Sequence, residues 1–292
     1  MACDEFQRAG GISADAYIDF QFSDQLRATF DPEVGALWLR WNPLPRPCFN
    51  PQLLAACKKY CDFLQDNKGM VQQSESSHAV EFSVLGSDVP GVFNLGGDLN
   101  LFTKLIEERD QLGLAEYGMA CVEVVYRNYV SYELPLTTVS LVEGECLGGG
   151  FEAALSSQVV IAERRARFGF PEILFNLFPG MGAVSFVLRR ADKKTAEELT
   201  HSGKIYSAEE LFRMGIIDMV VNDGEGSKAV RQYLRTTGRR LRPLFEMRRR
   251  VARLTREELA DIVDLWVDAA LRLTRRDLRL MGHIVARQDK LQ

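Results

Sequence analysis

The sequence predicts an α/β fold with a mainly parallel sheet, followed by a helical C-terminal region. Short apolar segments typical of strands alternate with helix-forming segments as far as Gly180, and this alternation is typical of βαβ units. Beyond Gly180 the pattern is helical almost throughout. The 292 residues are 46% hydrophobic and 26% charged, so the chain can bury a large core and is neither disordered nor fibrous.

The elements expected before residue 144 follow from local composition. Apolar or alternating runs indicate strands, a run of alternating prolines indicates an extended loop, and helical periodicity fills the stretches between them. The sequence thus predicts strands at 36–41, 78–85, 91–95 and 138–142, a loop at 42–47, and helices at 51–65 and 99–128.

The elements expected after residue 144 begin with a glycine-rich turn. The sequence predicts this turn at 144–150, a strand at 158–162, and helices at 151–156, 183–190, 195–202, 207–214 and 256–273. In the last helix, Ile262, Leu265, Trp266 and Ala269 are expected to share one apolar face.

Charge and residue usage narrow the class of protein. The net charge of −4 disfavours a general nucleic-acid binder, although residues 231–256 hold ten arginines and one acid, a local +9 on a remainder of −13. The six cysteines form no C-x-x-C pair and no zinc pattern, so we expect free thiols, no metal and a cytoplasmic location. Neither a signal peptide nor a membrane span is visible. With three histidines, acid–base chemistry is expected to fall to carboxylates.

The segment Leu147-Gly148-Gly149-Gly150-Phe151-Glu152 is the most informative in the chain. Glycines at a strand–helix junction let the backbone approach a ligand, and a helix N-terminus presents N–H groups that suit an oxyanion. They can equally serve close strand–helix packing. A second glycine turn at Phe93-Asn94-Leu95-Gly96-Gly97-Asp98 and the pair Pro171-Glu172 favour the functional interpretation.

These motifs, with the turn Pro179-Gly180-Met181-Gly182, resemble those of the crotonase superfamily, also called the enoyl-CoA hydratase/isomerase family. The resemblance implies a crotonase α/β fold with ββα repeats that form a spiral core. It implies a core at 34–221 and a helical region at 222–292 that serves trimerisation and closes the acyl pocket. The segment 1–33 matches least and has no assigned role.

The resemblance also implies the roles of single residues. Glu152 and Glu172 would be the catalytic acid and base, in an order left open, and the N–H groups of Leu95 and Gly149 would form an oxyanion hole for the thioester. The substrate would contact Gly96, Gly148, Leu147, Met181 and Trp266. For the last three, an ordinary core position is the alternative.

Within the family, the sequence looks most like the RpfF-type synthases of the diffusible signal factor, a cis-2-unsaturated quorum-sensing fatty acid. That likeness implies dehydration of a 3-hydroxyacyl thioester on acyl carrier protein, then hydrolysis to the free acid. No cofactor is expected beyond the phosphopantetheine of the carrier protein or of CoA. A conventional enoyl-CoA hydratase is the alternative enzyme, and a scaffold that binds a sensor protein is the alternative of another class.

Expected partners follow from the same likeness. Acyl carrier protein is acidic, so Arg248, Arg249 and Arg250 are candidates for a docking surface, with a solvated helix face as the alternative. The family likeness implies a trimer or hexamer of this chain. Nucleic acid and membrane insertion are not expected.

Overall fold

The computed structural model describes residues 17–73 and 76–288. Its central sheet has the strand order β1-β2-β3-β6-β8-β10-β13, and a smaller sheet has the order β12-β11-β9-β7. The strands of the central sheet are β1 (Ile18–Ser23), β2 (Leu26–Asp31), β3 (Ala36–Trp41), β6 (Phe82–Ser87), β8 (Thr137–Val142), β10 (Val159–Glu163) and β13 (Met219–Val221). The smaller sheet has β7 (Val92–Asn94), β9 (Glu145–Leu147), β11 (Arg167–Gly169) and β12 (Tyr206–Ser207).

The described part of the chain shows a repeated order of strand, strand and helix. Each of β6, β8 and β10 lies in the central sheet and is followed by a short strand of the smaller sheet and then by helical structure. From β3 to β13 neighbouring central strands are parallel, whereas β1, β2 and β3 form an antiparallel edge. The predicted α/β fold with ββα repeats is confirmed, and residues 18–31 extend the same sheet.

The strands in the middle of the central sheet consist largely of buried residues. All six residues of β8 are buried, as expected for a parallel strand covered on both faces. The turn after it requires glycine, because a Cβ on Gly144 would lie 2.0 Å from the carbonyl oxygen of Gly91. This close approach places β9 beside β7 and so brings the two glycine turns of the sequence together.

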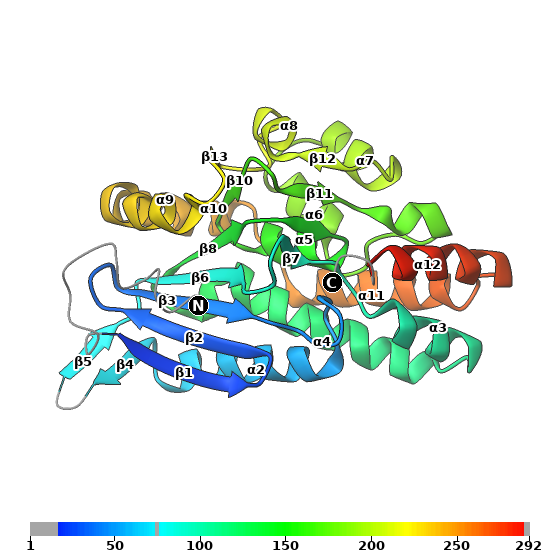
Figure 1. The fold of residues 1–292 in the computed structure, drawn as a ribbon, viewed down its shortest axis with the longest axis horizontal. Coiled ribbons are helices and arrows are strands. Elements are labelled where there is room, and N and C mark those ends of the chain that lie inside the picture. The colour runs from blue at the N-terminus through cyan, green and yellow to red at the C-terminus, as the bar shows by residue number, and fades with distance from the viewer. Residues whose placement is uncertain (1–16, 74–75, 289–292) are drawn as a thin grey trace.

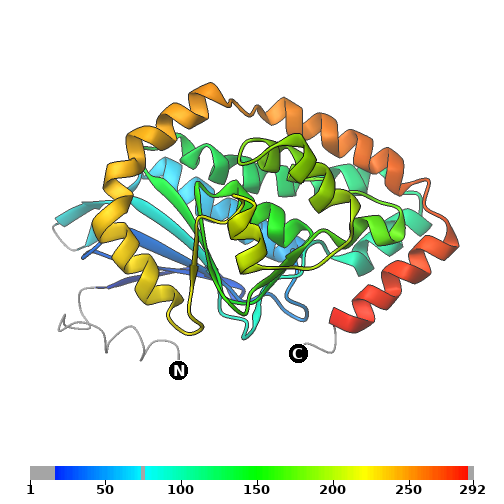
Figure 2. The same ribbon diagram turned by 90° about the horizontal axis from the view of Figure 1, so that it is seen from above.

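Helices cover the sheets and then extend around them. The helices of the body are α2 (Pro51–Asp66), α3 (Leu99–Glu107), α4 (Gln111–Tyr129), α5 (Gly149–Ser156), α6 (Ala183–Leu188), α7 (Lys193–His201) and α8 (Ala208–Arg213). The C-terminal helices α9 (Gly226–Tyr233), α10 (Arg239–Val251), α11 (Arg256–Ala270) and α12 (Arg275–Gln288) follow one another around the rim of the body (Figures 1 and 2). The helical C-terminal region is therefore present.

Several predicted elements need correction. The single helix expected at 99–128 is broken at Arg109, whose φ of 54° is left-handed, and Asp110 then caps α4 by accepting from the N–H of Gly113 at 2.9 Å. The single strand expected at 78–85 is two strands, because β5 (Ser76–Ala79) pairs with β4 (Met70–Gln73) in a hairpin outside the central sheet. Short strands β12 and β13 interrupt the region expected to be helical after Gly180.

The buried face of α11 is also shifted from the prediction. Leu265 is 63% exposed, so it does not belong to the buried face. Trp266 is buried as expected, and the other buried positions of this helix are Leu259, Val263, Val267 and Ala270. The predicted and the observed buried residues both have helical spacing, so the pattern alone does not decide which face is buried. Packing of α11 against α4 decides it.

Candidate active site

The two glycine turns meet at the first residues of α5. A Cβ on Gly96, whose φ is +95°, would lie 3.0 Å from the nitrogen of Gly149 and 3.0 Å from the carbonyl oxygen of Leu147. A Cβ on Gly150 would lie 2.2 Å from the carbonyl oxygen of Asn94. The glycines therefore allow the turn after β7 to pack directly on the N-terminus of α5.

Glu152 lies in the first turn of α5 and is buried. Its Oε1 accepts from the N–H of Met181 at 2.8 Å and from that of Ala183 at 2.9 Å. Burial raises the pKa of Glu152 to about 7, although these backbone donors act in the opposite direction. The predicted turn at 179–182 thus holds the carboxylate in a fixed position.

Glu172 is carried by a 3₁₀ helix, Pro171–Phe175, which follows β11. The residue as a whole is partly exposed, but its Oε2 is buried and has no hydrogen-bond partner among the described residues. Burial, and then the nearby charge of Glu152, raise the pKa of Glu172 to about 8.

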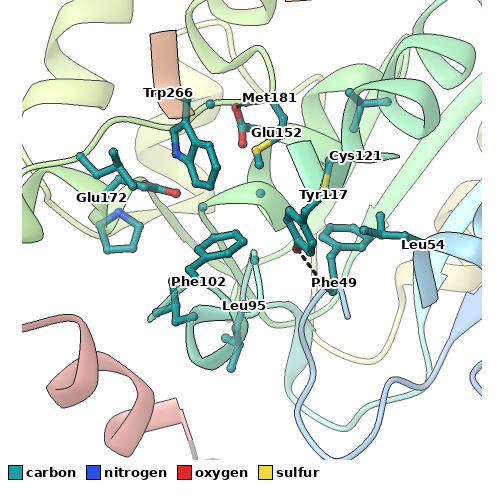
Figure 3. Close-up of a pocket in the computed structure, with 18 of the residues that line it drawn as sticks. Phe49, Leu54, Leu95, Phe102, Tyr117, Cys121, Glu152, Glu172, Met181 and Trp266 are labelled. Carbon is teal, nitrogen blue, oxygen red and sulfur yellow. Dashed lines mark hydrogen bonds between the residues drawn. The ribbon is translucent and has the colours of Figure 1, made fainter. Parts of the chain in front are cut away.

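Both glutamates line one pocket with a volume of about 50 Å³. In Figure 3, Trp266 and Met181 lie near the two carboxyl groups, while Phe49 and Leu54 lie on the opposite side. Gly148 and Gly149 also line this pocket. The structure therefore brings together Glu152, Glu172, Gly148, Gly149, Met181 and Trp266, whose roles remain proposals.

The prediction for Leu95 does not fit the geometry. Its side chain lines the pocket, but its N–H donates to the carbonyl oxygen of Pro47 at 2.8 Å and is therefore engaged. Gly97 is the better candidate, since its nitrogen lies 3.6 Å from the position of a Cβ on Gly149. Within the described residues, no hydrogen bond is assigned to the N–H of Gly97 or of Gly149.

Comparison with known proteins identifies the family. A sequence model described as enoyl-CoA hydratase/isomerase matches residues 61–255. The chain belongs to the enoyl-CoA hydratase/isomerase family. Human mitochondrial methylglutaconyl-CoA hydratase is similar, with 29% identity over 187 residues, which are 63% of this chain and 52% of that protein. The chain thus spans about half the length of the curated relatives it matches.

Solved structures of the enoyl-CoA hydratase/isomerase family share this fold. An enoyl-CoA hydratase from Bacillus halodurans has a TM-score of 0.73 at 18% identity, covering 89% of this chain and 100% of its own. Human mitochondrial delta3-delta2-enoyl-CoA isomerase has a TM-score of 0.71 at 19% identity, covering 91% and 99%. At this identity the likeness establishes the fold alone.

Two predicted contact residues lie beside the pocket of the two glutamates without lining it. Leu147 and Gly96 are absent from the described lining of the pocket that contains the glutamates. Leu147 ends β9, where it pairs with Gly169, and the backbone of Gly96 packs on Gly149.

Sequence reasoning missed Tyr117 and Phe102, whose rings pack edge to face in the pocket wall. Both residues fall in the stretch predicted as helical at 99–128, but nothing in their local sequence marked them as pocket residues.

The predicted docking arginines lie elsewhere. Arg248 and Arg249 line a separate cavity between α10 and the body, which neither glutamate lines. Arg248 stands over the ring of Phe245 at 6.0 Å, and Arg249 donates to the carbonyl oxygen of Val130. Arg250 is exposed. The structure therefore does not bring these arginines to the candidate active site.

The remaining sequence predictions concern thiols, metals and membranes. The five described cysteines are free, as predicted, and all are buried: Cys48, Cys57, Cys61, Cys121 and Cys146. Cys3 lies outside the described residues. In the part of the chain that the structure describes, no cluster of metal-ligating side chains occurs. None of the described helices combines the length and apolar character that a bilayer crossing requires.

Proposed function

We propose that the protein is a hydro-lyase that dehydrates 3-hydroxyacyl thioesters. One observation carries this proposal: Glu152, which is buried, and Glu172, which has a buried carboxyl oxygen, line one apolar pocket beside the backbone N–H groups of Gly97 and Gly149, and their pKa values are raised to about 7 and about 8. The family membership of the chain supports it.

The charge state of the pair suits general acid–base catalysis. Because the two carboxyl groups interact in a buried site, they titrate together, and near neutral pH the pair holds one proton. That proton resides mainly on Glu172, since backbone N–H groups stabilise the negative charge of Glu152. The ionised carboxylate can remove the proton at C2 of the substrate, and the protonated one can assist departure of the hydroxyl at C3.

The developing enolate needs hydrogen-bond donors at the thioester oxygen. The N–H of Gly149 begins α5, where N–H groups lack partners within the helix and the helix dipole is positive. The N–H of Gly97 belongs to the turn that packs on it. Together they would form the oxyanion hole, with Gly97 in the place first assigned to Leu95.

We further propose the product class that the sequence motifs imply. The substrate would arrive on acyl carrier protein, and the dehydrated thioester would be hydrolysed to a free 2-unsaturated acid of the diffusible signal factor type. The same oxyanion hole would serve hydrolysis, with a glutamate activating water. Release of the free acid distinguishes this reaction from simple hydration.

A conventional enoyl-CoA hydratase is the second candidate. The family match and the 29% identity to a methylglutaconyl-CoA hydratase favour it. Such an enzyme would act on the CoA thioester and leave the thioester bond intact.

An end-product assay separates these candidates. We expect purified protein with 3-hydroxydodecanoyl carrier protein to yield a free 2-unsaturated acid, detected by mass spectrometry. Product formed only from the CoA thioester, and still esterified, would favour the hydratase.

Charge reversal at Arg248, Arg249 and Arg250 tests the proposed docking surface. Equal losses of activity with carrier-bound and with small thioester substrates would exclude a docking role for these arginines.

Substitution of the glutamates tests the site itself. Glu152→Gln and Glu172→Gln should each lower kcat by at least about 100-fold, because each removes an acid–base group and preserves side-chain volume. Glu145→Gln is the matched control, since Glu145 lies on β9 near the motif and outside the described pocket lining. Normal turnover in either site variant would exclude the assignment.

A further inference from the structure

A second apolar cavity adjoins the pocket of the glutamates. It has a volume of about 30 Å³ and lies between α2, α4, α5 and the central sheet. Leu39, Trp41, Cys57, Tyr60, Cys61 and Leu85 are among the residues that line it. None of the proposed catalytic residues lines this cavity within the described chain, so the mechanism above does not use it.

Three residues line both cavities. Phe49, Val124 and Val125 contribute to the wall of the glutamate pocket and to that of the second cavity. The two spaces therefore lie back to back. In Figure 3, Phe49 lies beside Leu54 and Cys121, across the pocket from Glu172.

The partition can open only through side chains. Phe49 has its backbone held on both sides, because its N–H donates to the carbonyl oxygen of Gly96 at 2.8 Å and its carbonyl oxygen accepts from the hydroxyl of Tyr117 at 2.5 Å. Its ring packs edge to face on Trp41, with centroids 5.3 Å apart. Rotation of this ring, beside the short side chain of Val125, is the movement that would join the cavities.

The polar groups of the second cavity are already paired with one another. The hydroxyls of Tyr60 and Ser83 are 2.7 Å apart, and the hydroxyl of Tyr132 donates to Asn128 Oδ1 at 3.0 Å. Asn128 Nδ2 donates to Ser156 Oγ at 2.8 Å. Burial raises the pKa of Cys61 to about 12, so its thiol is neutral. The cavity thus suits a hydrocarbon and offers little to a polar ligand.

We propose that the second cavity is the distal end of the acyl site, reached past Phe49 and Val125, and that the protein accordingly takes long acyl chains. This inference rests on the proposed function, because it needs an acyl thioester at Glu152 and Glu172. The thioester stays beside the glutamates while the far methylenes leave the first pocket and displace no hydrogen bond in the second. Burial of those methylenes favours long chains over short ones.

Photo-crosslinking tests the path without requiring turnover. We would bind hexanoyl-CoA and dodecanoyl-CoA that carry a diazirine at the far end of the chain, irradiate each complex and map the labelled peptides. The dodecanoyl probe should label residues of the second cavity, such as Cys61 and Tyr132, while the hexanoyl probe labels only the first pocket. Labelling of the same first-pocket residues by both probes, or no labelling by either, would overturn the inference.

Substitution of one partition residue tests chain-length preference. Val125→Phe should weaken dodecanoyl-CoA relative to hexanoyl-CoA by at least about tenfold in Kd, and Val125→Ala should shift the ratio the other way. Circular dichroism checks that both variants fold. Equal effects on both ligands would count against the inference, as would no effect. Expected labelling and binding without catalysis would support the acyl path while rejecting the proposed dehydration.

Discussion

At the scale of single residues, the site depends on glycines whose neighbours leave no room for a side chain. Gly150 faces the carbonyl oxygen of Asn94, and Gly148 faces the carboxyl group of Glu172. The triple glycine therefore serves strand–helix packing and the candidate site at once. The packing interpretation is confirmed at Gly150, and the functional interpretation stays a prediction that Gly148 can test.

Gly148 gives a direct test of this geometry. A Cβ at this position would lie 2.5 Å from Glu172 Oε1, and its φ of +50° disfavours other residues. Gly148→Ala should displace the carboxyl group and lower kcat by about 100-fold, the cost of a displacement near 1 Å. Gly282→Ala is the control, because a Cβ there meets nothing within 4 Å. An unchanged kcat in Gly148→Ala would show that the position of Glu172 is not critical.

At the scale of elements, the 3₁₀ helix that carries Glu172 is fastened to α12. Asn176 ends this helix in the left-handed region, with φ of 56°, and its Nδ2 donates to Asp277 Oδ1 at 2.7 Å. The other oxygen of Asp277 accepts from the N–H and the hydroxyl of Thr274. The C-terminal region thus positions a candidate catalytic residue through Asn176.

Removal of the hydrogen bond between Asn176 and Asp277 should lower catalysis more than removal of the Thr274 hydroxyl from the α12 cap. Asn176→Gly keeps the left-handed backbone accessible but removes the hydrogen bond to Asp277, so kcat/KM should fall by about tenfold through looser placement of Glu172. Thr274→Ala removes the two contacts of the Thr274 hydroxyl with Asp277 but keeps the bond between Asn176 and Asp277, so it should leave kcat/KM within about twofold. Steady-state kinetics of the two variants compare these effects. Equal losses would indicate general loosening of α12.

The sequence predicted most elements because their patterns are local, and it failed where long-range contacts decide. The break at Arg109 and the exposure of Leu265 depend on how α4 and α11 pack. The motifs led to Glu152 and Glu172, which the structure places in one pocket. They did not exclude Leu95 as a donor, because the acceptor of its N–H, Pro47, lies 48 residues earlier in sequence than Leu95 and meets it only in the fold.

At the scale of the whole molecule, the uneven charge of the chain is partly balanced by folding. The arginine-rich stretch at 231–256 lies along the helical C-terminal region, and three of its members pair with acids of the body. Arg231 pairs with Asp31, Arg235 with Glu33 and Arg256 with Glu123. These ion pairs join the C-terminal helices to β2, to the turn after it and to α4. Three of the ten arginines in this stretch are therefore paired with the body of the fold.

Stability of the whole molecule should depend on pH through the two glutamates. Their pKa values are raised by folding from the ordinary 4.5, so the folded state binds more protons than the unfolded state, and stability should fall as pH rises toward about 8. Glu172→Gln removes this ionisation, so its gain in Tm over the natural protein should be larger near about pH 9 than near about pH 5. Calorimetric melts at both pH values measure this difference, with Glu145→Gln as the control. An equal gain at both would mean that Glu172 does not titrate across this range.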